Sequence, residues 1–219
     1  MMFKEKQNTT MHNFSFGITS DPLIQLACVI AALIHDLDHP GVPNAQLIKE
    51  QKRLAQAYRN QSIAEQNSLD LAWDLLMEDR YKDLRACIYT TQDEMERFRQ
   101  LLVNAVIATD VMDKELNSLR KARWHKAFMS SSPADLQQVA PCGCNGTQSN
   151  EDMNRMATIV IEHLIQASDV CHTMQHWHIY TKWNEKLFDE MYQAYLSGRA
   201  SEDPSKTWYQ GEIGFFDFY

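Results

Sequence analysis

Apolar residues recur three and four positions apart through most of this chain, and this spacing restricts its fold more than any other feature. Runs of strict two-residue alternation rich in β-branched residues are scarce. Spacing of three and four places side chains on one face of an α-helix, whereas alternation places them on one face of a strand. The sequence therefore predicts an all-α chain folded as a compact multi-helix bundle.

Start and stop signals indicate five helices. Asp21 followed by Pro22 is typical of an N-cap and a first helical position, and it predicts a helix that ends near Asp36. Four further helices are predicted at about 62–77, 93–110, 154–172 and 173–197, and Gly198 would end the last of them. Residues 130–150 are rich in Ser, Pro, Gly, Asn and Gln without helical periodicity. We expect a flexible loop there.

Composition and charge exclude some classes of function. The chain has 219 residues, of which 44% are hydrophobic, enough to bury the core of one domain and too many for a disordered chain. Its 29 acidic and 21 basic residues give a net charge of -8. This sign opposes a broad grip on nucleic acid, so we expect no nucleic-acid partner. A small anionic substrate would need a local cation such as a metal ion.

No segment is typical of a membrane span or of secretion. The longest nearly continuous apolar stretch, Leu23–Ile34, is shorter than the roughly 20 residues of a membrane span and predicts a buried helix. Met1–Thr10 lacks the apolar core and cleavage site of a secretory signal. The odd number of cysteines, 5, fits a reducing compartment. We expect a location in the cytoplasm or, within a longer protein, at the cytoplasmic face of a membrane.

The strongest local signal for chemistry is the run His35-Asp36-Leu37-Asp38-His39, at the end of the first predicted helix. The C-terminal end of a helix carries partial negative charge, so carboxylates there are unfavourable unless a cation offsets them. A metal ion would do so. Charges solvated at an exposed helix end would account for the same residues, and the run alone leaves both interpretations open.

A second acidic position lies far along the chain, near the end of another apolar helix. Asp169 stands among Ile165, Ala167 and Val170, so we expect its carboxylate to be buried. A buried carboxylate needs a partner or a metal ion. In a bundle, His35, Asp36 and Asp169 can converge from facing helices, and one nitrogen with two carboxylates suits zinc, magnesium, manganese or iron.

The stretch 31–44, which reads AALIHDLDHPGVPN, resembles the signature of class I 3',5'-cyclic nucleotide phosphodiesterase catalytic domains. These domains belong to the HD metal-dependent phosphohydrolase superfamily, whose all-α bundle is the fold that the resemblance implies. Further blocks follow in family order at Ser62–Glu65, Val106–Asp110, Gln166–Val170 and Gly211–Asp217. The resemblance covers residues 19–219, leaves 1–18 as an unmatched segment, and is most similar to algal and protist domains.

The resemblance implies a role for each matching residue. It makes His35, Asp36 and Asp169 ligands of two divalent ions, zinc and magnesium or manganese, with Asp36 bridging the two. Around the ions it places three residues that assist catalysis, His39, Glu65 and Thr109. It assigns the nucleotide to three residues: Phe215 stacks on the purine, Glu212 occupies the position that contacts the purine edge, and His172 lines the pocket.

The sequence departs from the family at several positions. The family's general acid and a further histidine ligand lie on an H-N-x-x-H motif, whereas this chain offers only His12-Asn13-Phe14-Ser15-Phe16, too close to His35 to take that place. We interpret His12 as an accidental likeness and expect a catalytic domain that is incomplete at both ends. The family's purine-gripping glutamine is Glu212 here, which leaves the preference between cAMP and cGMP open.

The sequence therefore predicts metal-dependent hydrolysis of cAMP, cGMP or both to 5'-monophosphates in cyclic nucleotide signalling, impaired in this chain. Two alternatives stay open: a catalytically inactive nucleotide-sensing or regulatory remnant, and another HD-type phosphohydrolase. The expected partner is the cyclic nucleotide, with regulatory or cyclase domains fused in a longer protein.

Overall fold

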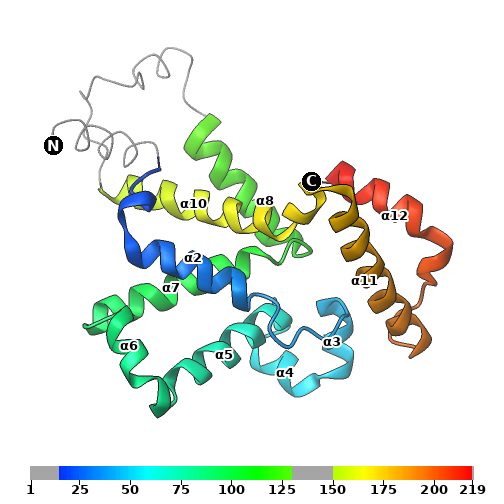
Figure 1. Cartoon of the computed structure of the whole chain (residues 1–219), viewed down its shortest axis with the longest axis horizontal. Helices are drawn as coiled ribbons and strands as arrows, with labels where there is room; N and C mark the ends of the chain where they lie inside the picture. The colour runs from blue at the N-terminus through cyan, green and yellow to red at the C-terminus, as the bar shows by residue number, and fades with distance from the viewer. Residues whose placement is uncertain (1–14, 130–149, 219) are drawn as a thin grey trace.

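The computed structural model describes residues 15–129 and 150–218, and every regular element within these two ranges is helical (Figure 1). The all-α prediction is confirmed. His12 lies outside the described residues, as does the expected loop up to residue 149. No helix in the described ranges combines the length and apolar character that crossing a membrane requires.

Four helices enclose the main core: α2 (Pro22–Ile34), α5 (Ile63–Met77), α7 (Gln92–Ala108) and α10 (Asn150–Asp169). Helix α7 packs against α2 and α10, and α2 and α10 also contact each other (Figure 1). On α2, Ala27 and Ala31 are spaced four apart and fully buried, which lets α7 approach closely. The core cluster joins side chains of all four helices, including Ile24, Leu69, Phe98, Leu102, Val106, Ile161 and Ile165.

The start of α2 follows the predicted N-cap signal. The Asp21 carboxylate accepts hydrogen bonds from the backbone N–H groups of Leu23 at 3.0 Å and Ile24 at 3.1 Å, and Pro22 takes the first helical position. Arg97 on α7 donates to the same carboxylate and so ties the two helices together. The prediction that α2 is a buried helix is wrong for one of its faces, because Val29 is 66% and Leu33 78% exposed.

A second apolar cluster forms beside α3 (Asn44–Glu50) and α4 (Lys52–Ala57), and it includes Val42, Leu47, Ala55, Ile63, Ala64 and Ala194. Ala194 belongs to α11 (Trp177–Leu196), which pairs with α12 (Pro204–Phe218) at one side of the molecule (Figure 1). We call α11 and α12 the C-terminal hairpin. Gly198 ends α11 with a φ of 75°, as its position predicted.

The remaining described elements are the short helices η1 (Ile18–Ser20), η2 (Asp79–Tyr81), α6 (Lys82–Ile88), α8 (Lys114–Trp124), η3 (His125–Met129) and η4 (Cys171–Met174). The boundary predicted between residues 172 and 173 is wrong. Helix α10 ends at Asp169 and α11 begins at Trp177, because the turn η4 separates them. This turn places Asp169 at the end of its helix, where it can reach α2.

Candidate metal centre

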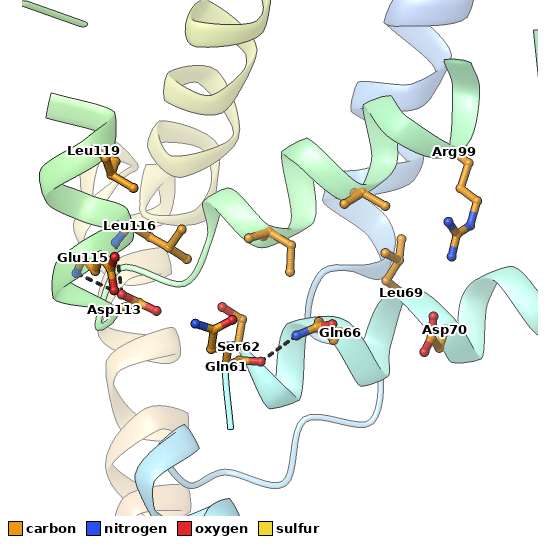
Figure 2. Close-up of a pocket in the computed structure, with 12 residues that line it drawn as sticks. Gln61, Ser62, Gln66, Leu69, Asp70, Arg99, Asp113, Glu115, Leu116 and Leu119 are labelled. Carbon is orange, nitrogen blue, oxygen red and sulfur yellow. Dashed lines mark hydrogen bonds between the residues drawn. The ribbon is translucent and has the colours of Figure 1, made fainter. Parts of the chain in front are cut away.

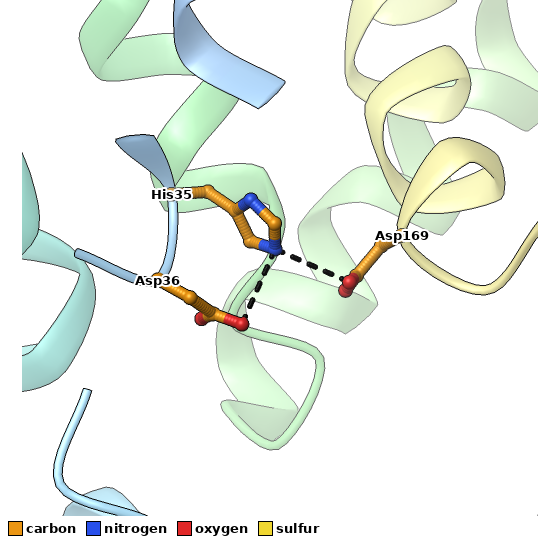
Figure 3. A group of neighbouring side chains, drawn as sticks. All are labelled: His35, Asp36 and Asp169. Atoms are coloured by element: carbon orange, nitrogen blue, oxygen red, sulfur yellow. Dashed lines mark hydrogen bonds and ion pairs between the residues drawn. The ribbon is translucent and has the colours of Figure 1, made fainter. Parts of the chain in front are cut away.

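Three of the predicted site residues meet where α2 and α10 end, and we call His35, Asp36 and Asp169 the metal trio (Figure 3). The Nε2 atom of His35 lies 3.2 Å from Oδ1 of Asp169 and 3.4 Å from Oδ2 of Asp36. One ligand atom of each residue lies within 4.8 Å of the other two. The predicted convergence of these residues is confirmed, whereas metal binding by them stays a prediction.

The His35 ring is held from both sides. Its Nδ1 atom lies 3.0 Å from the backbone carbonyl of Ala32, while Nε2 points to the carboxylates (Figure 3). The hydrogen bond to Asp169 raises the pKa of His35 to about 9, assisted by the Ala32 carbonyl and the charges of Asp36 and Asp169 and opposed by burial. Without a bound metal ion, the His35 ring is therefore a positively charged imidazolium at neutral pH, with an N–H donor on each of its two nitrogens.

The expected burial of Asp169 is wrong. Its side chain is 35% exposed and that of Asp36 is 65% exposed, against 19% for His35. Burial therefore does not force a cation onto these carboxylates. What the structure shows instead is two carboxylates that face one nitrogen of the His35 ring.

The donor set fits a divalent metal ion. When His35 donates from Nδ1 to the Ala32 carbonyl, the lone pair of Nε2 is directed between the two carboxylates, an arrangement that orients many metal-binding histidines. One imidazole nitrogen and two carboxylate oxygens suit zinc or manganese and, with more water, magnesium. Within residues 15–129 and 150–218, the metal trio is the one group of three or more His, Cys, Asp or Glu side chains that lie close enough to share an ion.

A network of polar groups lies next to the loop that follows the trio. Asn44 donates from Nδ2 to Glu65 at 2.9 Å and to Asp110 at 3.4 Å, and Ser62 donates to Asp110 at 2.7 Å. Burial raises the pKa of Glu65, and the nearby charge of Asp110 adds to this rise, while the Asn44 hydrogen bond and the charge of His39 oppose it. Asn44 thus separates two carboxylates that would otherwise repel.

Asn44 and Asp110 were not predicted as site residues. Both stand within the motifs that carry the resemblance, at the ends of the blocks 31–44 and 106–110. The available signal was a carboxylate directly after an apolar helix, the same signal that identified Asp36. Asp110 is only 5% exposed, and its hydrogen bonds make it part of the buried framework rather than a group that faces solvent.

Two further residues predicted near the ions are His39 and Thr109, and His172 was predicted to line the nucleotide pocket. His39 is exposed, and its Nδ1 accepts from the Gly41 N–H at 3.3 Å. Thr109 caps the end of α7, and its hydroxyl donates to the Val106 carbonyl at 2.7 Å. Its oxygen keeps lone pairs that can accept a hydrogen bond from water. His172 is half-buried in the turn η4, three residues after Asp169.

Two of the residues predicted to bind the nucleotide lie on α12. Glu212 accepts hydrogen bonds from the Tyr180 hydroxyl and from Nδ2 of Asn184, the latter at 2.6 Å. Burial and the Glu212 carboxylate raise the pKa of Tyr180 to about 12, so its hydroxyl remains a donor. Phe215 is half-buried and meets Phe216 edge-on. Neither Tyr180 nor Asn184 was predicted from the sequence, because only folding brings α11 against α12.

A separate cavity of about 460 Å³ lies among α5, α7 and α8, and none of the predicted site residues lines it (Figure 2). Leu69 and Leu116 contribute apolar walls, while Asp70, Arg99 and Glu115 contribute charge. Ser62 also lines this cavity and donates to Asp110, so one residue of the buried network borders the cavity.

The sequence of the chain is similar to a known protein family. Residues 2–218 match the sequence model of a family described as 3'5'-cyclic nucleotide phosphodiesterase. The match begins upstream of residue 19, where the resemblance carried by the motifs begins, and so takes in most of the segment 1–18. The family match thus covers nearly the whole chain.

Individual relatives are distant and longer. The dual specificity calcium/calmodulin-dependent 3',5'-cyclic nucleotide phosphodiesterase 1B of Bos taurus is 25% identical over 201 residues, which are 88% of this chain and 33% of the relative. The probable 3',5'-cyclic-AMP phosphodiesterase pde-4 of Caenorhabditis elegans is 27% identical over 168 residues, 77% of this chain and 23% of the relative. The chain therefore spans a third or less of the length of these relatives.

A solved structure shares the fold. The phosphodiesterase domain of the RhoPDE fusion protein from the choanoflagellate Salpingoeca rosetta superposes with a TM-score of 0.62 at 24% identity. The superposition covers 90% of this chain and 58% of that domain. The helical arrangement predicted from the motifs is thus that of a solved phosphodiesterase domain.

Proposed function

This chain belongs to the 3',5'-cyclic nucleotide phosphodiesterase family, and from that membership we propose that the metal trio is the centre of a metal-dependent hydrolysis of cyclic nucleotides to 5'-monophosphates. One observation carries the proposal: the contact between His35 and Asp169 at 3.2 Å, which joins the two motifs that supply ligands in the family. The match to the family covers residues 2–218 and supports the same activity.

The residues of the trio would supply three ligands to one ion, and Asp36 could also contribute to a second. The hydrogen bond to the Ala32 carbonyl keeps His35 in one orientation, so that Nε2 and Oδ1 of Asp169 face the same point. Asp36 is the most exposed of the three and has a second oxygen available for a second ion. A divalent ion held there would neutralise the phosphoryl oxygens and lower the pKa of a water molecule. We propose zinc with magnesium or manganese.

Nearby side chains would hold and move protons. Glu65 has a raised pKa, so it is suited to accept a proton or a hydrogen bond from water near the trio. Thr109 and His39 would orient water in the same region. On the hairpin, Phe215 would stack on the purine and Glu212 would contact its edge. Glu212 accepts hydrogen bonds only, and guanine offers N1–H beside its amino group, so we propose a preference for cGMP.

We propose that hydrolysis by this 219-residue chain is slow. The H-N-x-x-H pattern that supplies the family's general acid has no complete counterpart in the sequence. Without a general acid, the departing O3' must take its proton from water, which costs about 10²- to 10⁴-fold in rate. The same missing histidine favours the second candidate function, a chain that binds cyclic nucleotides without hydrolysing them.

Phosphorus NMR tests the proposal with cGMP and cAMP as substrates, in the presence of zinc with magnesium and of manganese alone. We expect slow formation of 5'-monophosphate that stops on chelation, resumes when metal is added back, and is lost in Asp169→Asn. Asp189→Asn is the matched control, because Asp189 is an exposed carboxylate on α11 outside the trio. Hydrolysis that survives chelation, or release of a 3'-monophosphate, would refute the proposal. Binding without turnover would support the second candidate.

A further inference from the structure

An arginine just beyond the end of α11 forms hydrogen bonds with the loop that follows His39. The guanidinium of Arg199 donates to the Glu50 carboxylate from Nε at 2.9 Å and from Nη2 at 2.6 Å, a two-pronged ion pair. Its Nη1 also donates to the backbone carbonyl of Pro40 at 3.0 Å. Arg199 thereby joins three segments: the end of the hairpin helix, the end of α3, and the residue after His39.

The same end of α11 packs closely on that loop. Gly41 has a φ of 68°, and a Cβ atom at this position would lie 2.5 Å from Oε1 of Glu190 on α11. Ala194 packs with Val42 and Leu47 in the second apolar cluster. The end of α11 therefore contacts this part of the molecule in three ways: through the Arg199 salt bridge, through the close approach of Glu190 to Gly41, and through the apolar contacts of Ala194. Together these contacts dock the end of α11 on the loop.

The opposite end of α11 begins after the turn η4, which starts two residues after Asp169. Tyr180 and Asn184 lie near this end and hold Glu212 on α12. Helix α11 is thus connected at one end, through the turn η4, to the helix that ends at Asp169, and is held at the other end by Arg199. Between these two points it carries the residues that set the position of Glu212.

We propose that Arg199 is a positioning residue, which holds the C-terminal hairpin on the loop after His39 and so keeps Glu212 and Phe215 in a fixed placement relative to the metal trio. The inference rests on the proposed function for the roles of Glu212 and Phe215. The docking of the hairpin by Arg199 stands on the contacts alone and can be measured separately.

The geometry sets the size of the effect. Helix α11 has 20 residues, about 30 Å at 1.5 Å per residue, and Tyr180 lies about 5 Å from its start. If α11 pivots about the η4 end by about 10°, the Arg199 end moves by about 5 Å and Tyr180 by about 1 Å. A displacement of about 1 Å takes a hydrogen bond outside its normal range of distances, so it would weaken a contact between Glu212 and the purine edge. We expect about a tenfold loss of nucleotide affinity.

The test compares Arg199→Ala, Arg199→Lys and the charge exchange Glu50→Arg with Arg199→Glu in the full chain. Arg80→Ala is the matched control, because Arg80 on η2 forms an exposed ion pair with Glu78, away from the hairpin. The readouts are the KM and kcat for cGMP, the Kd of cGMP by calorimetry, the Kd of Mn²⁺, and hydrogen exchange of the α11 and α12 amides.

In Arg199→Ala we expect KM and the Kd of cGMP to rise about tenfold, with kcat and the Kd of Mn²⁺ within twofold of the parent chain. Exchange of the hairpin amides should become faster, while α2 and α7 stay protected. Arg199→Lys keeps the charge but not the fork, so it should restore part of the affinity, as should the charge exchange. Arg80→Ala should change none of these quantities.

Unchanged hairpin exchange in Arg199→Ala would overturn the docking role whether or not the chain is an enzyme. Faster exchange with unchanged nucleotide affinity would overturn the positioning role. If the parent chain binds cGMP without hydrolysing it, the hydrolytic function fails while the Kd of cGMP still tests Arg199. If the parent chain binds no cGMP, the nucleotide site fails and the positioning role fails with it.

Discussion

Replacing Asp169 by asparagine should lower the pKa of His35 from about 9 towards its ordinary value of 6.5. The amide keeps the shape of the side chain and removes its charge. The carboxylate of Asp169 lies 3.2 Å from Nε2 of His35 and is the largest cause of the raised pKa. The substitution therefore tests whether the two ligand motifs meet in solution, without any need for metal or substrate.

The expected size follows from what remains after the change. The Ala32 carbonyl and the charge of Asp36 continue to favour the protonated ring, so the pKa should stop above 6.5. We expect a fall of about one to two units, which corresponds to about 1.5 to 3 kcal/mol of interaction between imidazolium and carboxylate. Partial exposure of Asp169 and screening by salt place the result towards the lower value.

The same shift predicts how the stability of the metal-free chain depends on pH. A group whose pKa is raised in the folded state adds stability below its unfolded pKa and loses that contribution as the pH rises through the folded pKa. For His35 the contribution is complete below about 6.5 and is lost by about 9. The urea concentration at the unfolding midpoint of the parent chain should therefore decrease as the pH rises from about 6.5 to about 9. In Asp169→Asn this decrease should be smaller.

Proton NMR of the histidine rings in the chelated chain measures the pKa directly. The chain has 8 histidines, and His35→Gln identifies the resonance that belongs to His35. Asp36→Asn provides a graded control, since Asp36 lies 3.4 Å away and is 65% exposed, so its removal should lower the pKa less. A His35 pKa near 6.5 in the parent chain, or one that Asp169→Asn leaves unmoved, would refute the geometry of the trio.

Three further predictions concern specificity and stability. Glu212→Gln, which restores a side chain able to donate as well as accept, should raise hydrolysis of cAMP relative to cGMP, and an unchanged ratio would exclude base selection by this residue. Asn44→Ala should lower the free energy of unfolding by about 1 to 3 kcal/mol in urea, because the buried Asp110 and the half-buried Glu65 lose their shared donor, and a neutral result would contradict that network. Phe98→Ala should cost about 3 to 5 kcal/mol, since its ring is fully buried in the main core. Leu33→Ala, at a residue 78% exposed, should change the free energy by less than about 0.5 kcal/mol, and a similar loss in both variants would contradict the placement of α2.

Local signals predicted the elements whose stability is local. Asp21 and Pro22 marked the start of α2, and Gly198 marked the end of α11, because caps act through the nearest backbone groups. The convergence of His35 with Asp169 was also predictable, since both follow apolar helices and carry ligand chemistry. The exposure of Asp169 was not predictable, because its apolar sequence neighbours do not reveal that α10 ends at this residue.

Contacts between segments that are distant in the chain were harder to predict from the sequence. Helices α3 and α4 have seven and six residues and depend on the second apolar cluster more than on their own periodicity. Tyr180 and Asn184 acquire a role only when α12 brings Glu212 against them. The pair of Arg199 with Glu50 joins residues far apart in the chain, and neither residue belongs to a motif.

Anomalous diffraction from crystals grown with Mn²⁺ tests the metal trio most directly. We expect a peak bonded to Nε2 of His35 and to a carboxylate oxygen of each aspartate, at about 2.0 to 2.2 Å. The same peak should be absent from crystals of Asp169→Asn grown under the same conditions. A manganese peak elsewhere in the chain with the trio still closed by its own hydrogen bonds, or a peak unaffected by Asp169→Asn, would contradict the account.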